Sequence, residues 1–148
     1  MGTHLSTRGK YGVKAMFELS RQAKCGPVSL KTIARNQGLS EHYLEQLVGP
    51  LRRAGLITSA RGSRGGYLLG REAAEITVAD IIRVLEGPIV PCDCVSGDAS
   101  VHHCGAPGGC VAKGVWEMVR DSVAALLDSI TLEDLALAKE SSGVPGTG

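Results

Sequence analysis

Residues 40–69 read SEHYLEQLVGPLRRAGLITSARGSRGGYLL, and this stretch decides the fold. Ser40 is a good helix N-cap, and apolar side chains recur behind it at helical spacing, so a helix with one buried face should start here. Pro50 interrupts that spacing, so we expect a kink or a fresh start there. Two β-prone runs, 56–60 and 67–69, flank a glycine-rich turn, which is typical of a β-hairpin.

Two further helices are predicted upstream of this stretch. Residues 9–24 read as a helix with apolar side chains on one face, and Gly26-Pro27 ends it. Ser29 can cap a second helix, which Gly38 stops just before the next one begins. Two short helices joined by a tight glycine turn and followed by a hairpin have the order of a winged helix-turn-helix. We therefore predict a mainly α fold with a small β-hairpin wing.

A long C-terminal helix is expected beyond the wing. Thr77 and Asp80 suit a capping-box-like start for a fourth helix, which Glu86-Gly87-Pro88 ends. A fifth helix should run from about Val111 to Ser129, and its apolar residues, from Trp116 to Ile130, alternate by three and four positions as in a coiled coil. Such a seam, roughly 30 Å long at ~1.5 Å per residue, is too much for so small a domain to hide. We expect a partner subunit to cover it in a homodimer.

The charge of the chain is divided between its two halves. The net charge is +1, yet residues 1–71 carry 12 Lys/Arg and 3 Asp/Glu, whereas residues 72–148 carry 4 Lys/Arg and 12 Asp/Glu, which gives +9 and −8. A basic half points to a polyanionic partner, and nucleic acid is the commonest one. A random scatter of surface charge is the alternative, and the size of the split argues against it.

The exposed faces of the predicted third helix and hairpin suit DNA. A helix fits the major groove of B-form DNA, where Gln can read adenine and Glu can accept from cytosine. Arginines on a glycine-rich tip suit a phosphate or a narrow minor groove. A phosphate loop for a mononucleotide is disfavoured, because the tip lacks the Gly-Lys-Ser/Thr ending. The predicted DNA-contacting residues are Ser40, Glu41, His42, Tyr43, Glu45, Gln46, Arg52, Arg61, Gly62, Ser63, Arg64 and Gly65.

Four of the five cysteines fall between Cys92 and Cys110, in a loop rich in glycine and proline. A disulfide, a structural zinc ion or an iron–sulfur cluster could account for them. A reducing cytosol disfavours the disulfide. Zinc modules present paired Cys-x2-4-Cys knuckles, whereas the one close pair here, Cys92-x-Cys94, is a residue too tight. Thiolates on an irregular loop are reasonable iron–sulfur ligands, and Cys25 lies apart beside Gly26-Pro27.

Seven motifs span nearly the whole chain, namely LSTRGKYG at 5–12, YLEQL at 43–47, GLI at 55–57, RG at 61–62, GGYLL at 65–69, EGPI at 86–89 and VW at 115–116. Together they resemble the IscR-type iron–sulfur cluster regulators of bacteria. The resemblance implies a homodimeric winged-helix transcription factor whose metal cluster tunes DNA binding. It also implies that Glu45 takes part in discriminating DNA sites.

The resemblance also implies three cluster ligands. Counting back from Trp116, Cys110 and Cys104 take the places of the family's last two loop cysteines. Cys94 stands where some members place their first loop cysteine. Cofactor and metal ligands are thus expected at Cys94, Cys104 and Cys110.

The fourth ligand departs from the family pattern. Some members carry a histidine ligand three residues after the last cysteine, where this chain has Lys113. Other members take the fourth ligand from the first helix of the partner subunit, at positions that match Lys10 and Lys14 here. A charged lysine cannot serve as a cluster ligand, because its ammonium group has no lone pair to donate. Cys92 is the first candidate for the fourth ligand and His103 the second, with His102, an external thiol or solvent also open.

We therefore predict a cytoplasmic, iron–sulfur cluster-sensing regulator that binds double-stranded operator DNA as a homodimer and controls cluster biogenesis or redox-response genes. A 2Fe–2S cluster is favoured over 4Fe–4S. The alternatives are a cluster-free winged-helix regulator that senses thiol redox state or a small metabolite, and a Cys-dependent redox enzyme, which lacks an acid–base pair here. No membrane segment or signal peptide is expected. The predicted organisation is a DNA-binding domain at 1–86, a cluster-binding loop at 87–110, dimerisation helices at 111–140 and a disordered tail at 141–148.

Overall fold

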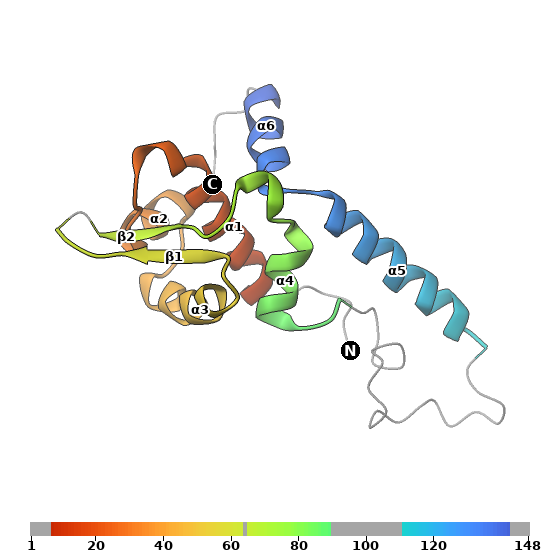
Figure 1. Cartoon of the computed structure of the whole chain (residues 1–148). Coiled ribbons are helices and arrows are strands. Elements are labelled where there is room, and N and C mark those ends of the chain that lie inside the picture. Colours follow the sequence, from red (N-terminus) through yellow and green to blue (C-terminus); the bar gives the residue numbers. More distant parts are fainter. Residues whose placement is uncertain (1–6, 64, 90–110, 143–148) are drawn as a thin grey trace.

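The fold is a small helical body with a two-stranded hairpin at its edge and a long helix that projects from it (Figure 1). The computed structural model describes residues 7–63, 65–89 and 111–142. The predicted fold class is confirmed. In chain order the elements are α1 (Thr7–Arg21), η1 (Ala23–Cys25), α2 (Leu30–Gln37), α3 (Glu41–Arg53), β1 (Ile57–Ala60), β2 (Gly66–Leu69), η2 (Ala73–Glu75), α4 (Val78–Glu86), α5 (Lys113–Ser129) and α6 (Leu132–Ser142).

Capping side chains set the bounds of α2 and α3 where the sequence predicts them. The Ser29 hydroxyl accepts a hydrogen bond from the Thr32 N–H at 3.1 Å, and the Ser40 hydroxyl accepts one from the Tyr43 N–H at 3.3 Å. Between the two helices Gly38 has φ +66°, a left-handed conformation that favours glycine. Short-range hydrogen bonds and this glycine therefore set where α2 ends and where α3 begins.

The core lies where α1, α3 and α4 meet. Helix α1 contributes Met16, which is 0% exposed, and α3 contributes Leu44 and Leu47. Helix α4 approaches α1 closely, because a Cβ atom added at Gly12 would lie 2.1 Å from Cδ1 of Leu85. On α4, Val78, Ile81, Ile82 and Leu85 are all buried, so these residues form its inward face.

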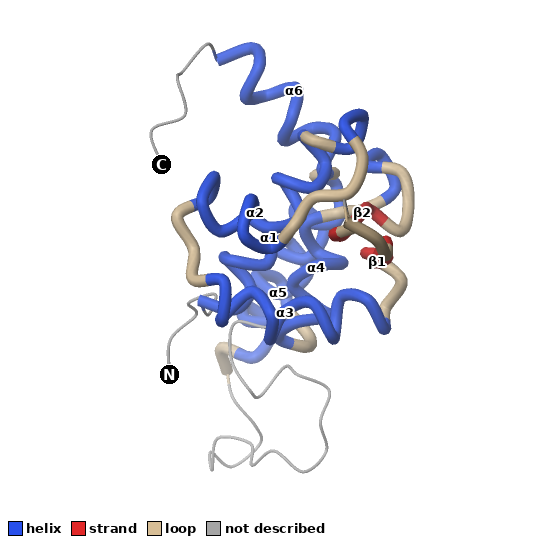
Figure 2. The backbone as a smooth tube through the Cα atoms, turned by 90° about the vertical axis from the view of Figure 1, so that its left-hand side faces the viewer, coloured by secondary structure: helices blue, strands red, loops and turns tan. Residues whose placement is uncertain are grey.

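The wing is a short antiparallel pair whose register runs from Ile57↔Leu69 to Ala60↔Gly66. Its root is bonded to the residue before α2, because the Val28 and Tyr67 backbones exchange two hydrogen bonds of 2.9 and 2.8 Å. Figure 2 shows the hairpin at one edge of a body made of helices. The wing therefore extends from a fixed base next to the helix-turn-helix.

Three sequence expectations are revised by the structure. Of the kink or fresh start predicted at Pro50, the fresh start is excluded, because helix α3 continues through Pro50 to Arg53. Pro50 lies in the last turn, where the Ala54 N–H closes the helix by donating to the Pro50 carbonyl at 3.1 Å. The first helix ends at Arg21, and a separate turn, η1, covers the residues up to Cys25. At the carboxyl end, α6 reaches Ser142, two residues into the predicted tail, whose remainder lies outside the described residues.

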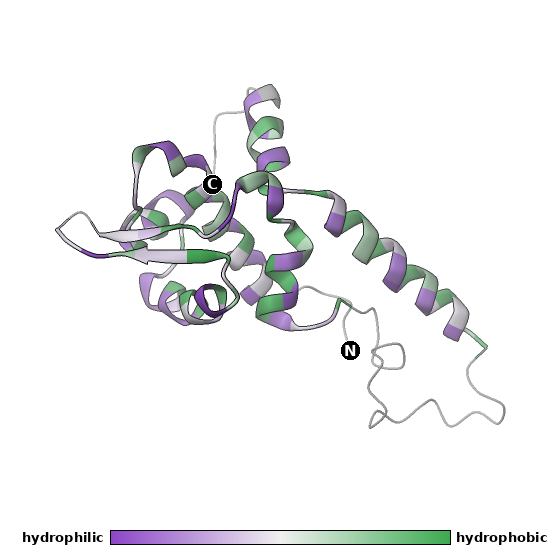
Figure 3. Ribbon diagram, viewed as in Figure 1, coloured by the Kyte–Doolittle hydropathy of each residue, from purple (hydrophilic) through white to green (hydrophobic). Residues whose placement is uncertain are grey.

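Helix α5 contributes no buried residue along its 17 residues. Figure 1 shows it leaving the body at its carboxyl end, near α4 and α6. Hydrophobic and hydrophilic residues alternate along it (Figure 3), and Trp116 is 39% exposed and Leu126 61% exposed. Among the described helices, none is both long and apolar enough to cross a membrane.

Candidate nucleic-acid interface

Helix α3 presents a polar face to solvent and an apolar face to the core. The buried side holds Leu44, Leu47 and Leu51. The solvent side exposes the predicted reading residues Ser40, Glu41, His42, Glu45 and Gln46. On this side His42 Nδ1 lies 3.8 Å from Glu45 Oε2. A helix with this division can enter a groove without losing its packing on the body.

Tyr43, which is also among the predicted DNA-contacting residues, lies at the margin of the exposed face of α3. It is half-buried, and its ring packs edge-on against Tyr11 of α1, with centroids 5.5 Å apart and an interplanar angle of 84°. Lys14 Nζ lies 6.0 Å from the Tyr11 ring centroid. This contact joins the first turn of α3 to α1, so α1 supports the end of α3 that would enter a groove first.

The hairpin tip places basic and small residues beside α3. Arg61, Gly62 and Ser63 are exposed and Gly65 is half-buried, while Arg64 lies outside the described residues. Figure 1 shows the hairpin and α3 next to each other, away from α5. Two more exposed arginines, Arg52 and Arg53, end α3. The predicted DNA-contacting residues that the structure describes therefore belong to two neighbouring parts of the fold, α3 with its N-cap and the hairpin.

A buried carboxylate that sequence reasoning missed holds this part together. Glu18 of α1 is 0% exposed. Its carboxylate accepts hydrogen bonds from Asn36 Nδ2 at 2.8 Å and Gln37 Nε2 at 2.6 Å, both in the last turn of α2. It also accepts from Arg21, the last residue of α1, and from Gln22 directly after it. Glu18 thus ties α1 to the residues just before the glycine turn.

The environment of Glu18 favours its charged form. Burial alone would raise the pKa of this carboxyl, but the hydrogen bonds from its amide donors, together with the arginine charge, outweigh burial and hold the pKa below its ordinary value of 4.5. In the sequence Glu18 looks like one more polar position of an amphipathic helix. Its role needs the amides of α2, which only the fold brings near.

The structure describes both flanks of the cysteine loop, but its predicted ligands Cys92, Cys94, Cys104 and Cys110, and the alternative His103, lie outside the described residues. On the entry side, Glu86 Oε1 accepts a hydrogen bond from the Gly9 N–H at 3.1 Å, and Arg8 Nε donates to the Leu85 carbonyl at 3.0 Å. The chain therefore enters the loop from a point bonded to the first turn of α1.

Metal-ligating side chains do not gather elsewhere in the part of the chain that the structure describes. No group of three or more His, Cys, Asp or Glu side chains there could hold a metal ion. Cys25 is exposed at the end of η1. The cluster ligand set accordingly stays a prediction from the sequence.

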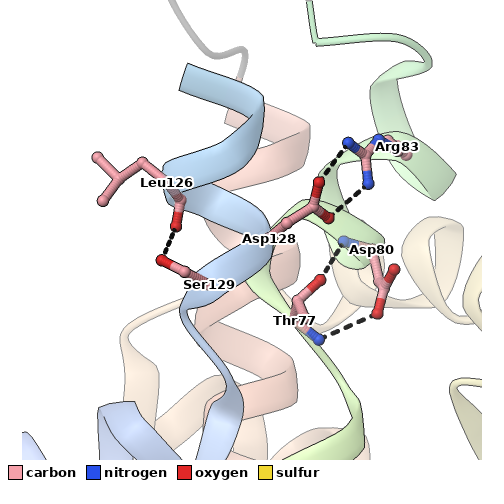
Figure 4. Close-up of polar contacts among 6 residues, drawn as sticks. All are labelled: Thr77, Asp80, Arg83, Leu126, Asp128 and Ser129. Atoms are coloured by element: carbon pink, nitrogen blue, oxygen red, sulfur yellow. Dashed lines mark hydrogen bonds and ion pairs between the residues drawn. The ribbon is translucent and has the colours of Figure 1, made fainter. Parts of the chain in front are cut away.

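An ion pair connects α4 to α5 on the other side of the body (Figure 4). Arg83 donates from both terminal nitrogens to Asp128, with Nη1–Oδ1 at 2.7 Å and Nη2–Oδ2 at 2.9 Å. These hydrogen bonds hold the pKa of Asp128 below its usual range. Because two hydrogen bonds join the pair, it restrains the orientation of Asp128 relative to Arg83 as well as the distance between them.

Comparisons with known proteins agree with a DNA-binding regulator. Residues 5–138 match the Rrf2 family, described as iron-dependent transcriptional regulators. The chain is 50% identical to the HTH-type transcriptional regulator CymR of Bacillus subtilis over 132 residues, which are 89% of this chain and 88% of that one. It is 38% identical to the HTH-type transcriptional regulator IscR of Photorhabdus laumondii over 144 residues, 96% of this chain and 84% of that one.

Solved structures have the same fold. T. potens IscR superposes with a TM-score of 0.78 at 48% identity, over 97% of this chain and 93% of that one. The structure of B. subtilis CymR, described as the global cysteine regulator of that organism, superposes with a TM-score of 0.77 at 50% identity. This match covers 91% of this chain and 97% of that one. These matches confirm the resemblance to IscR-type regulators. The relatives are transcriptional regulators and not enzymes, as predicted.

Proposed function

The chain belongs to the Rrf2 family of transcriptional regulators, and from that premise we propose that it binds operator DNA as a homodimer and senses through an iron–sulfur cluster on its cysteine loop. The observation that carries the proposal is the exposed polar face of α3 beside the basic wing. Two copies of this surface would read two half-sites in successive major grooves, about 34–36 Å apart. In this proposal Glu45 takes part in discriminating DNA sites.

The homodimer is supported by the apolar side of α5. Val115, Met118 and Leu126 are each more than half exposed, which is unusual for three large apolar residues on one helix. A second copy of the same helix has a matching apolar side, and closed twofold pairs are the commonest oligomers. Pairing of two α5 helices would remove this surface from water.

The donor chemistry of the loop fits an iron–sulfur cluster. Four thiols within 19 residues can supply the sulfur ligands that such clusters take, and we propose Cys94, Cys104 and Cys110 with Cys92 or His103 as the fourth. Lys10, Lys14 and Lys113 are exposed, and an ammonium has no lone pair to donate. The fourth ligand should therefore come from the loop or from a small molecule. Once bound, a cluster of this kind supplies a response to iron and oxidants, and we propose control of cluster biogenesis or redox-response genes.

Anaerobic purification of the full chain tests the cluster. We expect iron, acid-labile sulfide and visible absorption in the wild type, and the loss of all three in Cys104→Ala. Cys25→Ala is the matched control, because this exposed thiol lies outside the loop, and it should keep the cluster. A reconstituted wild type without iron and sulfide would overturn the cluster proposal.

Binding to duplexes selected from a random library tests the DNA reader. Because basic side chains release counterions from phosphates, log K should fall linearly with log salt, with a slope of roughly −0.9 for each phosphate contacted. An affinity that does not change with salt would contradict the reading surface that we propose.

A second candidate function is a cluster-free regulator that senses thiol redox state or a small metabolite. The observation in its favour is the 50% identity to a protein described as a cysteine regulator. Iron and sulfide analysis separates the two candidates. A cluster-free regulator contains neither element, and its operator affinity changes on addition of cysteine or a thiol oxidant.

A further inference from the structure

Helix α5 meets the body through a joint near its carboxyl end. The joint includes a short backbone bridge, in which the Val78 N–H donates to the Ile130 carbonyl at 2.8 Å and the Leu132 N–H donates to the Ile76 carbonyl at 3.0 Å. Ile76 and Leu132 are both 0% exposed, so the bridge is anchored in the core. The chain just after α5 is therefore held in place as a pivot for this helix.

Reciprocal caps stiffen both strands of this bridge. Thr77 and Asp80 form a capping box at the start of α4, with bonds of 3.0 Å in each direction. Thr131 and Asp134 form the same arrangement at the start of α6, with bonds of 2.9 and 3.1 Å. The two threonines face each other across the bridge. The pivot is thus built from two capped helix starts.

The Arg83–Asp128 pair braces α5 beside this pivot. Asp128 lies two residues before the bridge on α5, and Arg83 lies five residues after Val78, which is about 7.5 Å along α4. Figure 4 shows the pair joining the two helices next to the Thr77 cap, with the Leu126 side chain on the other side of α5. A bidentate link at this distance from the pivot opposes rotation of α5.

Small rotations of α5 have large consequences because the helix is long. Its 17 residues make an arm of about 25 Å at about 1.5 Å per residue. A rotation of about 8° moves the far end of such an arm by about 3.4 Å, the rise of one base pair. If α5 helices pair in a dimer, the angle at each joint sets the distance between the two reading helices.

We propose that the Arg83–Asp128 pair determines the half-site spacing that the dimer selects, which makes both residues specificity-determining positions far from the DNA. The proposal rests on the dimeric DNA reader proposed above. Arg83 and Asp128 are positioning residues, since they act through the angle of α5 and touch no base.

The solvent exposure of the Arg83–Asp128 pair limits how strongly it can favour one half-site spacing over another. The two side chains are 41% and 44% exposed, and a solvent-accessible ion pair changes an equilibrium by a factor of about 2 to 5. A dimer contains two copies, so the pair can favour one spacing over its neighbours by a factor of about 4 to 25. A brace of this strength selects a spacing without being required for folding.

Binding to a library of duplexes tests the proposal. Each duplex carries the same two selected half-sites, separated by spacers that differ by one base pair. We expect the wild type to prefer one spacing about tenfold over its neighbours, and Arg83→Lys and Asp128→Asn to reduce this to about twofold. The exchanged pair, Arg83→Asp with Asp128→Arg, should recover selectivity. Asp121→Asn is the matched control, because Asp121 lies seven residues before Asp128 on the same side of α5 and pairs within its own helix, with Arg120 at 2.9 Å.

The outcomes separate this proposal from the one on which it rests. A wild type that binds no duplex as a dimer overturns the proposed function. A selective wild type whose Arg83→Lys and Asp128→Asn variants keep the same spacing profile overturns the brace alone. Loss of the dimer in sedimentation of these variants also overturns it, because the pair would then belong to the interface.

Discussion

Helices α1 and α5 have similar lengths, 15 and 17 residues, and both carry an apolar side. The apolar side of α1 is buried in the core, whereas that of α5 is exposed to solvent. Helix α1 buries Met16 and Leu19 and packs so closely on α4 that a Cβ atom at position 12 would displace the Leu85 side chain. Helix α5 buries nothing, and the only tryptophan of the chain, Trp116, is exposed on it. The difference teaches that apolar periodicity predicts a helix with a buried side without saying which chain will bury it.

Substitution of one methionine in each helix should give the largest difference between α1 and α5. Met16→Ala should lower the free energy of unfolding by about 2–5 kcal/mol, because it leaves a cavity in the core. Met118 of α5 is 70% exposed, so Met118→Ala should change that free energy by no more than about 0.5 kcal/mol in dilute monomer. Urea unfolding at low protein concentration measures both.

Equal effects of the two methionine substitutions would contradict the contrast between the helices. An effect of Met118→Ala that grows with protein concentration would sharpen the contrast, since it would place Met118 in a contact between chains.

Leu126→Glu tests the exposed side of α5 by its effect on DNA. We expect operator affinity to fall about 100-fold, or ~2.7 kcal/mol, because the charge would separate the dimer and each monomer would then bind its half-site alone. The unfolding midpoint of the monomer should stay unchanged, since Leu126 is 61% exposed. Ala74→Glu adds the same charge to an exposed residue of η2, outside α5, and is the control. Sedimentation of both variants decides the matter, and a dimeric Leu126→Glu would show that this side of α5 is not the contact.

Glu18→Gln tests the polar part of the α1 core. The substitution should lower the free energy of unfolding by about 2–3 kcal/mol at neutral pH, because a neutral amide loses charge-assisted hydrogen bonds and brings donors of its own. The pKa of Glu18 is lowered by folding, so its contribution is complete above the ordinary value of 4.5 and is lost as pH falls below it.

Unfolding of the wild type and Glu18→Gln across an acid series checks this dependence. The difference between the two proteins should be constant above about pH 5 and should shrink toward lower pH. A difference that grows on acidification would mean that the carboxyl is not stabilised in its charged form.

Arg61→Ala gives the smallest expected effect and tests the basic half of the chain. Removal of one phosphate contact per subunit should make the slope of log K against log salt less negative by about 2 for a dimer. Lys113→Ala, at the start of α5, is the control and should leave the slope unchanged. Fluorescence anisotropy at several salt concentrations measures both, and equal slopes for the wild type and Arg61→Ala would remove the wing from the interface.

Local chemistry explains why most of the fold could be predicted from the sequence. Ser29, Gly38 and Ser40 act on their nearest neighbours, so the helix-turn-helix follows from a few adjacent residues. The inward side of α4 follows from helical spacing in the same way. Pro50 is the exception, because its spacing alone could not separate a kink from a fresh start, and α3 continues through it to Arg53.

The site was harder to predict because its supports join distant residues. Glu18 bonds to side chains 18 and 19 positions away, and Arg83 reaches Asp128 across 45 positions. Periodicity carries no signal for such pairs. The reading face of α3 was accessible to prediction, since it is simply the side that the apolar residues leave exposed.

The solitary exposed tryptophan gives the protein an internal optical probe. Trp116 is the only indole in the chain and lies near the start of α5, so its emission spectrum depends on whatever covers that helix. Water around the ring shifts the emission to longer wavelengths, and a covering surface shifts it back. Association at α5 can therefore be followed by fluorescence without a dye.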